Sequence, residues 1–434
     1  MKFKHTTYCG IHKFFALLIV MSSTFFLVAN CSKPKIMYAN LREVPNVAEG
    51  FLHYVDFTDY REDTTFETLD PNIVSGACTT IRCGDIYGRN FDFYYNNSVT
   101  YIAHVAHTDT RFESIGVSRH EGIDKQTVED IEASGVYNKH IELIPNLTLD
   151  GINENGVVCN CNVVDLENFP ITTGTNPGKK RLYMYFVCRY ILDNARSADH
   201  AIDLLNERDI FLSEDATTNA HLMIADHSKT YIVEFIANQV IVKEKTGDNQ
   251  IMTNFYNNLN DNDPSGLSSL SENACGMERY RWSRGREEDL NYFYHGETAF
   301  KNYPDDCKKF FTKWEDLNTI PKMMEALKNN KISRAYTTLG NDGNPYPIWP
   351  SEDCSQTVLK TPELFTQWKN NTFPKFCEEF KSIVEAKRRD IGREKDVWVT
   401  NHSSVYDITH KTLTIAGEED FDHPTTFTVS GEIK

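Results

Sequence analysis

The order of strand-like and helix-like segments in this chain of 434 residues predicts an α+β fold. A hairpin pattern covers residues 78–91, and two helix-like segments follow at Lys180 to Arg196 and from Ser197 to about Arg208. Strand-like runs come next, and after a mostly helical stretch they return between Trp398 and Val429. Strands and helices are thus expected in both halves of the chain.

Each of these elements has its own signal. The first helix is expected to bury Leu182, Phe186, Tyr190 and Ile191, and Ser197 has the side chain of an N-cap for the second. A strand meander is expected next, and Pro321 is expected at the start of a later helix. The three strands of the meander are predicted at His221 to Asp226, Thr230 to Ile236 and Gln239 to Lys243.

The N-terminus has the pattern of a targeting signal. Lys2, Lys4 and Lys13 precede an apolar run from Phe14 to Val28, which suits the core of a signal peptide and is short for a bilayer span. We therefore expect an exported protein with a signal in residues 1–31. Two alternatives stay open: a lipid anchor at Cys31, or plain secretion or delivery to a lysosome-like compartment.

The rest of the chain divides into a leader and a catalytic domain. Residues 32–77 carry few apolar periodicities and many acidic side chains, which is typical of a propeptide or cover segment. Residues 78–434 are predicted to form one catalytic domain with a helical insertion at about 261–395. The sequence is also compatible with a homo-oligomer.

The net charge limits the binding partners that the chain can have, and the cysteine content limits its disulfides. A formal net charge of −17 argues against nucleic acid and anionic membrane surfaces as the main partner of the chain.

Eleven cysteines in an exported protein leave at least one thiol unpaired. Cys159 and Cys161 point the same way from one strand and are a poor pair. Better disulfide candidates are Cys275, Cys307, Cys354 and Cys377.

The hairpin at residues 78–91 holds the most informative residue, Cys78. A two-residue loop at Gly84-Asp85 sets Cys78 opposite Phe91, whereas a three-residue loop sets it opposite Asn90. Either register brings Cys78 within a residue or two of Arg89 and Asp92.

Small residues, Ser75 to Ala77, precede this cysteine, as at a self-cleavage site. Cleavage before Cys78 would give one residue both the attacking thiol and an α-amine with a pKa near ~7.7, which acts as the base. Arg89 would favour the thiolate, and Asp92 would hold the ammonium form or orient the amine. The pattern therefore indicates an N-terminal nucleophile hydrolase.

Further elements resemble the choloylglycine hydrolase family of linear amide hydrolases, which includes bile salt hydrolase, penicillin V acylase and, more distantly, acid ceramidase. They follow one another in family order after Cys78-Thr79. These elements are Gly88 to Asp92, Leu149 to Val157, Ile251 to Asn254, Glu278 to Tyr280, Ser404 to Asp407 and Lys411 to Ile415.

This resemblance implies an αββα sandwich of two antiparallel sheets flanked by helices, and it implies a set of site residues. Cys78 matches the nucleophile, Arg89 and Asp92 the pair beside it, Asn254 the active-site asparagine and Arg279 the later arginine. Asn162 matches the oxyanion-hole asparagine, with Asn160 on the same face of its strand as the alternative. No cofactor is implied.

We therefore expect an exported cysteine amidase that hydrolyses a linear, non-peptide C–N bond of an N-acylated small molecule. The alternatives are an acyltransferase on the same scaffold and a catalytically inactive surface-binding lipoprotein. His104 and His107 lack the motif of a zinc site, so no metal is expected.

Overall fold

The computed structural model places much of the chain from Tyr38 onward, and the signal predicted in residues 1–31 lies outside the described part. Within the described ranges, no helix has the length and apolar character needed to cross a bilayer. The described ranges are 38–44, 52–60, 77–94, 98–124, 141–165, 178–212, 218–236, 239–247, 249–254, 256–257, 317–329, 337–339, 345–347, 398–418 and 420–434.

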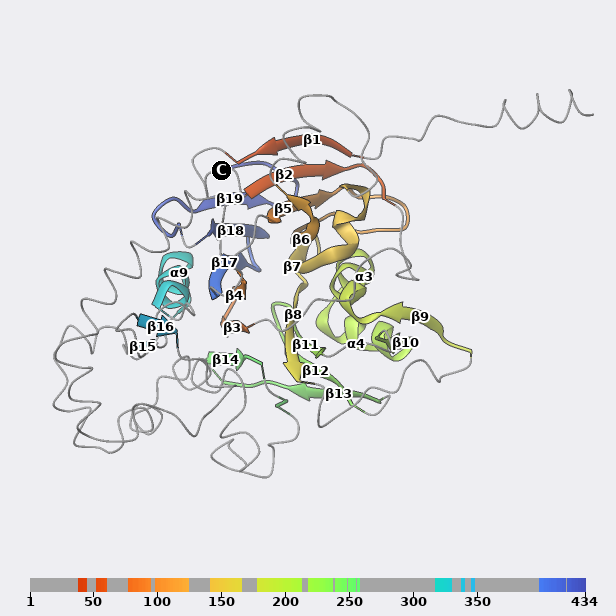
Figure 1. Ribbon diagram of the computed structural model, residues 1–434. Coiled ribbons are helices and arrows are strands. Elements are labelled where there is room, and N and C mark those ends of the chain that lie inside the picture. The colour runs from red at the N-terminus through yellow and green to blue at the C-terminus, as the bar shows by residue number, and fades with distance from the viewer. Residues whose placement is uncertain are drawn as a thin grey trace, which may run out of the picture. The chain divides into compact units, whose positions relative to one another are not determined.

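The larger sheet has nine strands in the order β1-β2-β5-β6-β7-β8-β11-β12-β13 (Figure 1). All neighbours in it are antiparallel except β2 and β5, which run parallel. Its strands are β1 (Tyr38–Glu43), β2 (Leu52–Phe57), β5 (Ser98–Val105), β6 (Ser114–Asp124), β7 (Thr148–Asn153), β8 (Val158–Asp165), β11 (Thr218–Ala225), β12 (Thr230–Ile236) and β13 (Gln239–Glu244).

The smaller sheet has six strands in the order β14-β3-β4-β17-β18-β19, all antiparallel. Its central strands join the first hairpin to the C-terminal strands, so segments more than 300 residues apart in sequence lie side by side. Its strands are β14 (Asn249–Met252), β3 (Ala77–Cys83), β4 (Ile86–Tyr94), β17 (Trp398–Asp407), β18 (Thr412–Gly417) and β19 (Thr425–Thr428).

The two sheets pack face to face over one apolar core. Tyr87, Tyr406 and Leu413 of the smaller sheet belong to the same buried cluster as Ile152 and Val158 of the larger one. Alternation along each strand leaves the other face of each sheet for a helical layer.

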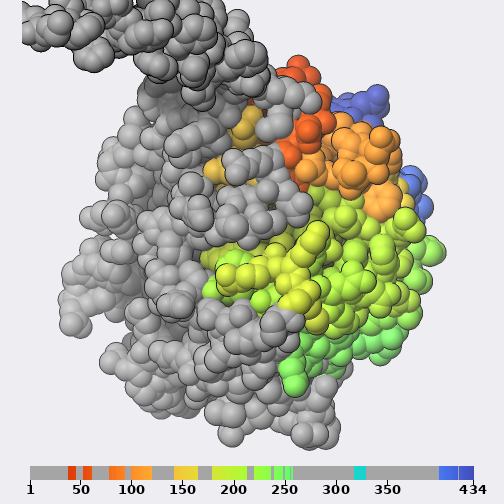
Figure 2. Space-filling model, turned by 90° about the vertical axis from the view of Figure 1, so that its right-hand side faces the viewer, coloured from red at the N-terminus to blue at the C-terminus, as the bar shows by residue number. Residues whose placement is uncertain are grey.

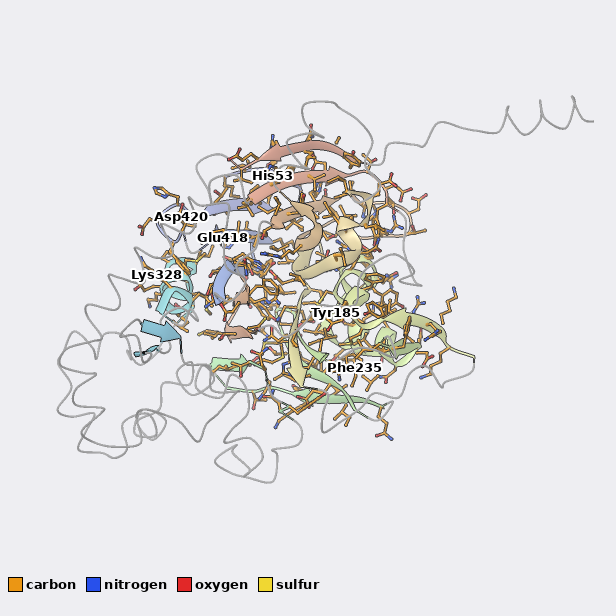
Figure 3. All side chains as sticks on the ribbon, in the orientation of Figure 1. His53, Tyr185, Phe235, Lys328, Glu418 and Asp420 are labelled. Atoms are coloured by element: carbon orange, nitrogen blue, oxygen red, sulfur yellow. The ribbon has the colours of Figure 1, made fainter. Side chains whose placement is uncertain are left out.

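Helices cover both outer faces. Helices α3 (Val187–Asn194) and α4 (Ala198–Asn206) share a buried cluster with the nine-stranded sheet, and α9 (Ile320–Asn329) shares one with the six-stranded sheet. Figure 2 faces the α3 and α4 side, and Tyr185 and Phe235 of that cluster are labelled in Figure 3. The resulting four layers, helix, sheet, sheet and helix, are the αββα sandwich that the family resemblance implied.

Two glycines allow the helices to approach the sheets. A Cβ at Gly151 would lie 2.5 Å from the Leu192 Cδ1 atom of α3, and one at Gly88 would lie 2.6 Å from the Met323 Cγ atom of α9. Any larger residue at these two positions would push a helix away from its sheet.

Most predicted elements are confirmed, with one clear correction. The helix expected over Lys180 to Arg196 begins only at Val187, because the first residues form strand β9 (Lys180–Tyr183), followed by the short helix η3 (Met184–Phe186). Strand β9 pairs in parallel with β10 (Arg208–Phe211), a partner that the local apolar spacing does not reveal. Leu182, Phe186, Tyr190 and Ile191 are nonetheless all buried as expected.

The remaining helix and strand predictions agree with the structure. The Ser197 side chain caps α4 by accepting a hydrogen bond from the His200 amide (3.1 Å). The meander is formed by β11, β12 and β13, the C-terminal strands by β17, β18 and β19, and Pro321 lies in the first turn of α9. Of the stretch predicted as mostly helical, the described residues also include the small hairpin of β15 (Thr337–Leu339) and β16 (Pro345–Pro347).

Two strands of the large sheet come from the segment predicted as a leader. Strands β1 and β2 lie within residues 32–77, and β2 pairs with β5 over its whole length. Leu52, Val55 and Phe57 of β2 are fully buried, as part of the core. Because β2 is buried on both faces, its sequence lacks the alternation that would have predicted it.

Candidate active site

Cys78 lies on β3, next to the strand that carries Arg89. The loop between β3 and β4 is the two-residue Gly84-Asp85, and Cys78 pairs with Phe91, which confirms the first of the two predicted registers. Gly84 has a φ of +57°, a backbone conformation that glycine adopts without strain. The tight turn thereby fixes which residues of β4 face the thiol.

The Arg89 guanidinium points at the Cys78 sulfur. Its Nη2 atom lies 3.6 Å from Sγ, and both residues are fully buried. A positive charge at this distance from sulfur stabilises the thiolate, the nucleophilic form of cysteine. The geometry thus places a positive charge beside the Cys78 sulfur.

Arg89 is itself held in place from the opposite sheet. Its Nη1 atom forms an ion pair with Asp150 on β7, and its Nη2 atom also donates to the Cys161 carbonyl on β8 (2.7 Å). Burial alone would lower the pKa of Arg89, but the charge of Asp150 outweighs it and raises that pKa above its usual value. Arg89 therefore stays charged beside the sulfur.

Asp150 is the residue that the sequence interpretation missed. Besides Arg89, its carboxylate accepts hydrogen bonds from His402 Nε2 (3.0 Å), Ser404 Oγ (2.7 Å) and the Tyr406 hydroxyl. Burial would raise the pKa of Asp150, but Arg89 and His402 outweigh it and hold that pKa far below its usual value. The one available signal was an aspartate within the motif Leu149 to Val157, to which no role was given.

His402 links this network to the side of the nucleophile. Its ring stacks on Phe91, with centroids 5.2 Å apart, and Phe91 is the partner of Cys78 in the hairpin. Burial lowers the pKa of His402, and the neighbouring Asp150 opposes this shift without reversing it. His402 thus donates a hydrogen bond to Asp150 from a fully buried position.

Asn254 reaches the backbone of the predicted nucleophile. Its Oδ1 atom accepts a hydrogen bond from the Cys78 backbone nitrogen (2.7 Å), and its Nδ2 atom donates to the Val163 carbonyl (2.7 Å). This nitrogen is the one that cleavage before Cys78 would turn into an α-amine. The structure therefore brings together Cys78, Arg89 and Asn254, as the resemblance implied.

Asn160 and Asn162 share one face of β8 and contact Thr80 of the facing sheet. Asn160 Nδ2 donates to Thr80 Oγ1 (2.9 Å) and to Asn162 Oδ1 (2.8 Å). The Asn162 amide donates to Thr80 Oγ1 (3.2 Å) and to the Thr253 carbonyl (3.2 Å). Asn162 thus lies against the residue that precedes Asn254, and its oxyanion role stays a prediction.

Asp92 and Arg279 complete the predicted set. Asp92 pairs with Ala77, the residue before the predicted cleavage point, and its Oδ1 atom accepts a hydrogen bond from Thr400 Oγ1 (2.5 Å). Its role toward the Cys78 amine stays a prediction. Arg279 lies outside the described residues, as do the disulfide candidates Cys275, Cys307, Cys354 and Cys377.

The described residues form no cluster of three or more His, Cys, Asp or Glu side chains that could hold a metal ion. His104 lies between Asp56 and Glu113, and His107 contacts Glu154. The cysteines in the described part of the chain are all buried, namely Cys78, Cys83, Cys159, Cys161 and Cys188.

Comparison with known protein families identifies one match. The family model for acyl-coenzyme A:6-aminopenicillanic acid acyl-transferase matches residues 144–343, somewhat less than half of the chain. This match supports the resemblance to the choloylglycine hydrolase family that the sequence predicts. The matched range includes Asn162, Asn254 and Arg279, whereas Cys78, Arg89 and Asp92 precede it.

Three solved structures match the chain at low sequence identity and low TM-score. Two variants of conjugated bile acid hydrolase from Clostridium perfringens share 14% and 12% identity with the chain, at TM-scores of 0.37 and 0.38. Each alignment covers 82% of this chain and 95% or 96% of the other. Penicillin V acylase from Agrobacterium tumefaciens shares 14% identity over 81% of this chain and 84% of its own, at a TM-score of 0.33. No curated protein matches the chain significantly.

Proposed function

We propose that the chain is a cysteine amidase that hydrolyses a linear C–N bond of an N-acylated small molecule after cleavage between Ala77 and Cys78. The observation that carries the proposal is the pair of contacts at Cys78. Arg89 lies 3.6 Å from its sulfur, and Asn254 accepts a hydrogen bond from its nitrogen. Sulfur and nitrogen of one residue each have a dedicated partner, which is what a nucleophile with its own amine base requires.

Maturation would begin with attack of the Cys78 thiol on the Ala77 carbonyl. The peptide bond to the Cys78 nitrogen breaks as a thioester forms, and water then hydrolyses the thioester. The products are a carboxylate at Ala77 and a free amine at Cys78. Asn254 is already bound to this nitrogen, so the new amine would be formed in place.

Turnover uses the same two atoms. The thiol proton moves to the α-amine, whose usual pKa near ~7.7 suits a base at neutral pH. The thiolate attacks the substrate carbonyl carbon, and the ammonium protonates the leaving nitrogen as the C–N bond breaks. Water then gives a proton to the α-amine and attacks the thioester, which releases the acid and restores the thiol.

An oxyanion hole must stabilise the tetrahedral intermediate. Loss of one such donor typically costs roughly 3 to 4 kcal/mol of barrier. We propose the amide group of Asn162 for this role, with Asn160 as the alternative, because both face the sheet that carries Cys78. Asp92 is proposed to orient the Cys78 amine, and Arg279 is proposed for the site by its motif alone.

Cleavage at Ala77-Cys78 need not release the preceding segment. Strands β1 and β2 lie N-terminal to the cleavage point and are paired into the large sheet, where β2 is buried. We propose that the mature enzyme keeps them as a bound fragment. Export by the N-terminal signal, with or without a lipid anchor at Cys31, is part of the same proposal.

An acyltransferase is the second candidate. The matched family is named for an acyl-transferase, which passes the acyl group to an acceptor other than water. The thioester on Cys78 would form in the same way, and only its second step would differ. The fate of the acyl group therefore decides between the two candidates.

A substrate panel tests this function. Purified protein is incubated with N-acyl amides of varied acyl and amine parts, with and without a second amine as acceptor, and all products are identified by mass spectrometry. Release of acid and amine, abolished in Cys78→Ala, supports the amidase. Transfer to the added amine in preference to water supports the acyltransferase, and unchanged substrates throughout would support the inactive binding protein.

A further inference from the structure

Three polar side chains form a row across the inner face of the nine-stranded sheet. Asn162 on β8 pairs directly with His221 on β11, and Glu234 on β12 lies beside His221. All three are fully buried. Buried polar residues in such a position require partners, and those partners identify what the row is for.

The row contacts the short segment that follows β14. This segment carries Asn254. Its described residues are 253, 254, 256 and 257. We propose that His221 and Glu234 are positioning residues, which hold this segment so that Asn254 meets the Cys78 nitrogen. The inference rests on the proposed function and extends it to two residues that neither the sequence motifs nor the family match assigns to the site.

His221 binds the residue before Asn254. Its Nε2 atom lies 2.7 Å from the Thr253 carbonyl oxygen, which also accepts the Asn162 amide. A carbonyl oxygen only accepts hydrogen bonds, so Nε2 is the donor in this contact. Two donors thus converge on one backbone oxygen adjacent to Asn254 and fix its orientation.

Glu234 connects His221 to the other end of the segment. Its Oε1 atom lies 3.4 Å from His221 Nδ1, and the same oxygen accepts a hydrogen bond from the Asn257 backbone nitrogen. His221 and Glu234 therefore hold the segment on both sides of Asn254. His221 binds Thr253, and Glu234 binds Asn257. Backbone that lacks a strand or helix partner is held by such side-chain bonds.

The accuracy of this placement matters for chemistry. Asn254 contacts the Cys78 nitrogen at 2.7 Å, and a misplacement of the order of 1 Å can cost about 100-fold in rate. His221 contacts this segment through Thr253 and Glu234 contacts it through Asn257, so both would act through the segment. A change in either should therefore lower kcat and leave substrate binding largely intact.

The test compares two substitutions of His221. His221→Gln keeps an N–H group at about the position of Nε2, whereas His221→Leu keeps the volume and removes the donor. Thr414→Val is the control for stability, because it removes a partly buried hydrogen bond to Thr426 (2.9 Å) at the β18–β19 edge of the other sheet. Glu234→Gln is a second, milder variant, because its amide oxygen still accepts from Asn257.

The measurements are the melting temperature, the fraction cleaved before Cys78, and kcat and KM per Cys78 thiol titrated. We expect His221→Leu to lower kcat about 10- to 100-fold with KM within about 2-fold, and His221→Gln to recover most of the loss. Glu234→Gln should lower kcat less than His221→Leu does, and Thr414→Val should match the wild type.

Equal kcat in the wild type, His221→Leu and Glu234→Gln would overturn the inference and leave the proposed function intact. So would equal losses in His221→Gln and His221→Leu that merely follow the melting temperature, since these indicate a purely structural role. A folded wild-type protein that neither cleaves itself nor turns over any substrate would overturn the proposed function, and the inference with it.

Discussion

Arg89 and Asp150 form a buried ion pair that joins the two sheets directly beside Cys78. Arg89 comes from β4 of the six-stranded sheet and Asp150 from β7 of the nine-stranded sheet. The pair thus couples the packing of the sandwich to the position of the charge that faces the thiol.

Substitution of Asp150 should therefore weaken the fold severely. Asp150→Asn leaves the buried charge of Arg89 uncompensated, and we expect a loss of about 3 to 5 kcal/mol in the free energy of unfolding. Ser404→Ala removes one hydrogen bond to the same carboxylate and should cost only about 1 kcal/mol. Urea unfolding of the two variants measures both values, and equal costs would show that the charge pair is not what matters.

Asp92→Asn should separate catalysis from stability. The amide oxygen of asparagine can still accept the hydrogen bond from Thr400 Oγ1, so the melting temperature should change little. If the carboxylate orients the Cys78 amine, kcat should fall at least about 100-fold. Steady-state kinetics of the variant give the answer, and near wild-type turnover would leave Asp92 with a structural role only.

His104 should make stability depend on pH. It lies between Asp56 of β2 (2.7 Å) and Glu113 (3.1 Å). Burial would lower the pKa of His104, but its hydrogen bonds to the two carboxylates outweigh burial and raise that pKa. The pKa of Asp56 is lowered, because hydrogen bonds, with His104 first among them, outweigh the effect of burial.

The two shifts define a window of pH. A raised histidine pKa gives stability that is fully present below the unfolded value near ~6.5 and is lost as the pH rises through the folded value. A lowered aspartate pKa gives stability that is present above ~3.9 and is lost as the pH falls. We therefore expect His104→Gln to lower the melting temperature more at about pH 5.5 than at about pH 9. A difference that does not vary with pH would contradict this.

Much of the fold follows from the sequence because its signals are local. The turn at Gly84-Asp85, the Ser197 cap and the alternation in β11 and β12 each depend on residues close together in the chain. Strand β2 was missed because it is buried on both faces and lacks alternation, and β9 was missed because its parallel partner β10 follows helices α3 and α4 in the sequence.

The residues of the site also divide into those that the sequence predicts and those that it does not. Cys78 and Arg89 are brought together by one hairpin, and the resemblance added Asn254. Asp150, His221 and Glu234 gave no such signal, because each acts across strands on a residue far away in sequence. A lone acid or histidine within an apolar strand pattern is visible in the sequence, but its partner is not.

The mass of the purified protein under denaturing conditions tests the central claim most directly. The account predicts two fragments for the wild type, the larger beginning at Cys78, and one uncut chain for Cys78→Ala. Under native conditions the two wild-type fragments should stay together, because β2 is buried in the large sheet. An active wild-type protein in which Ala77 and Cys78 remain covalently joined would contradict the account.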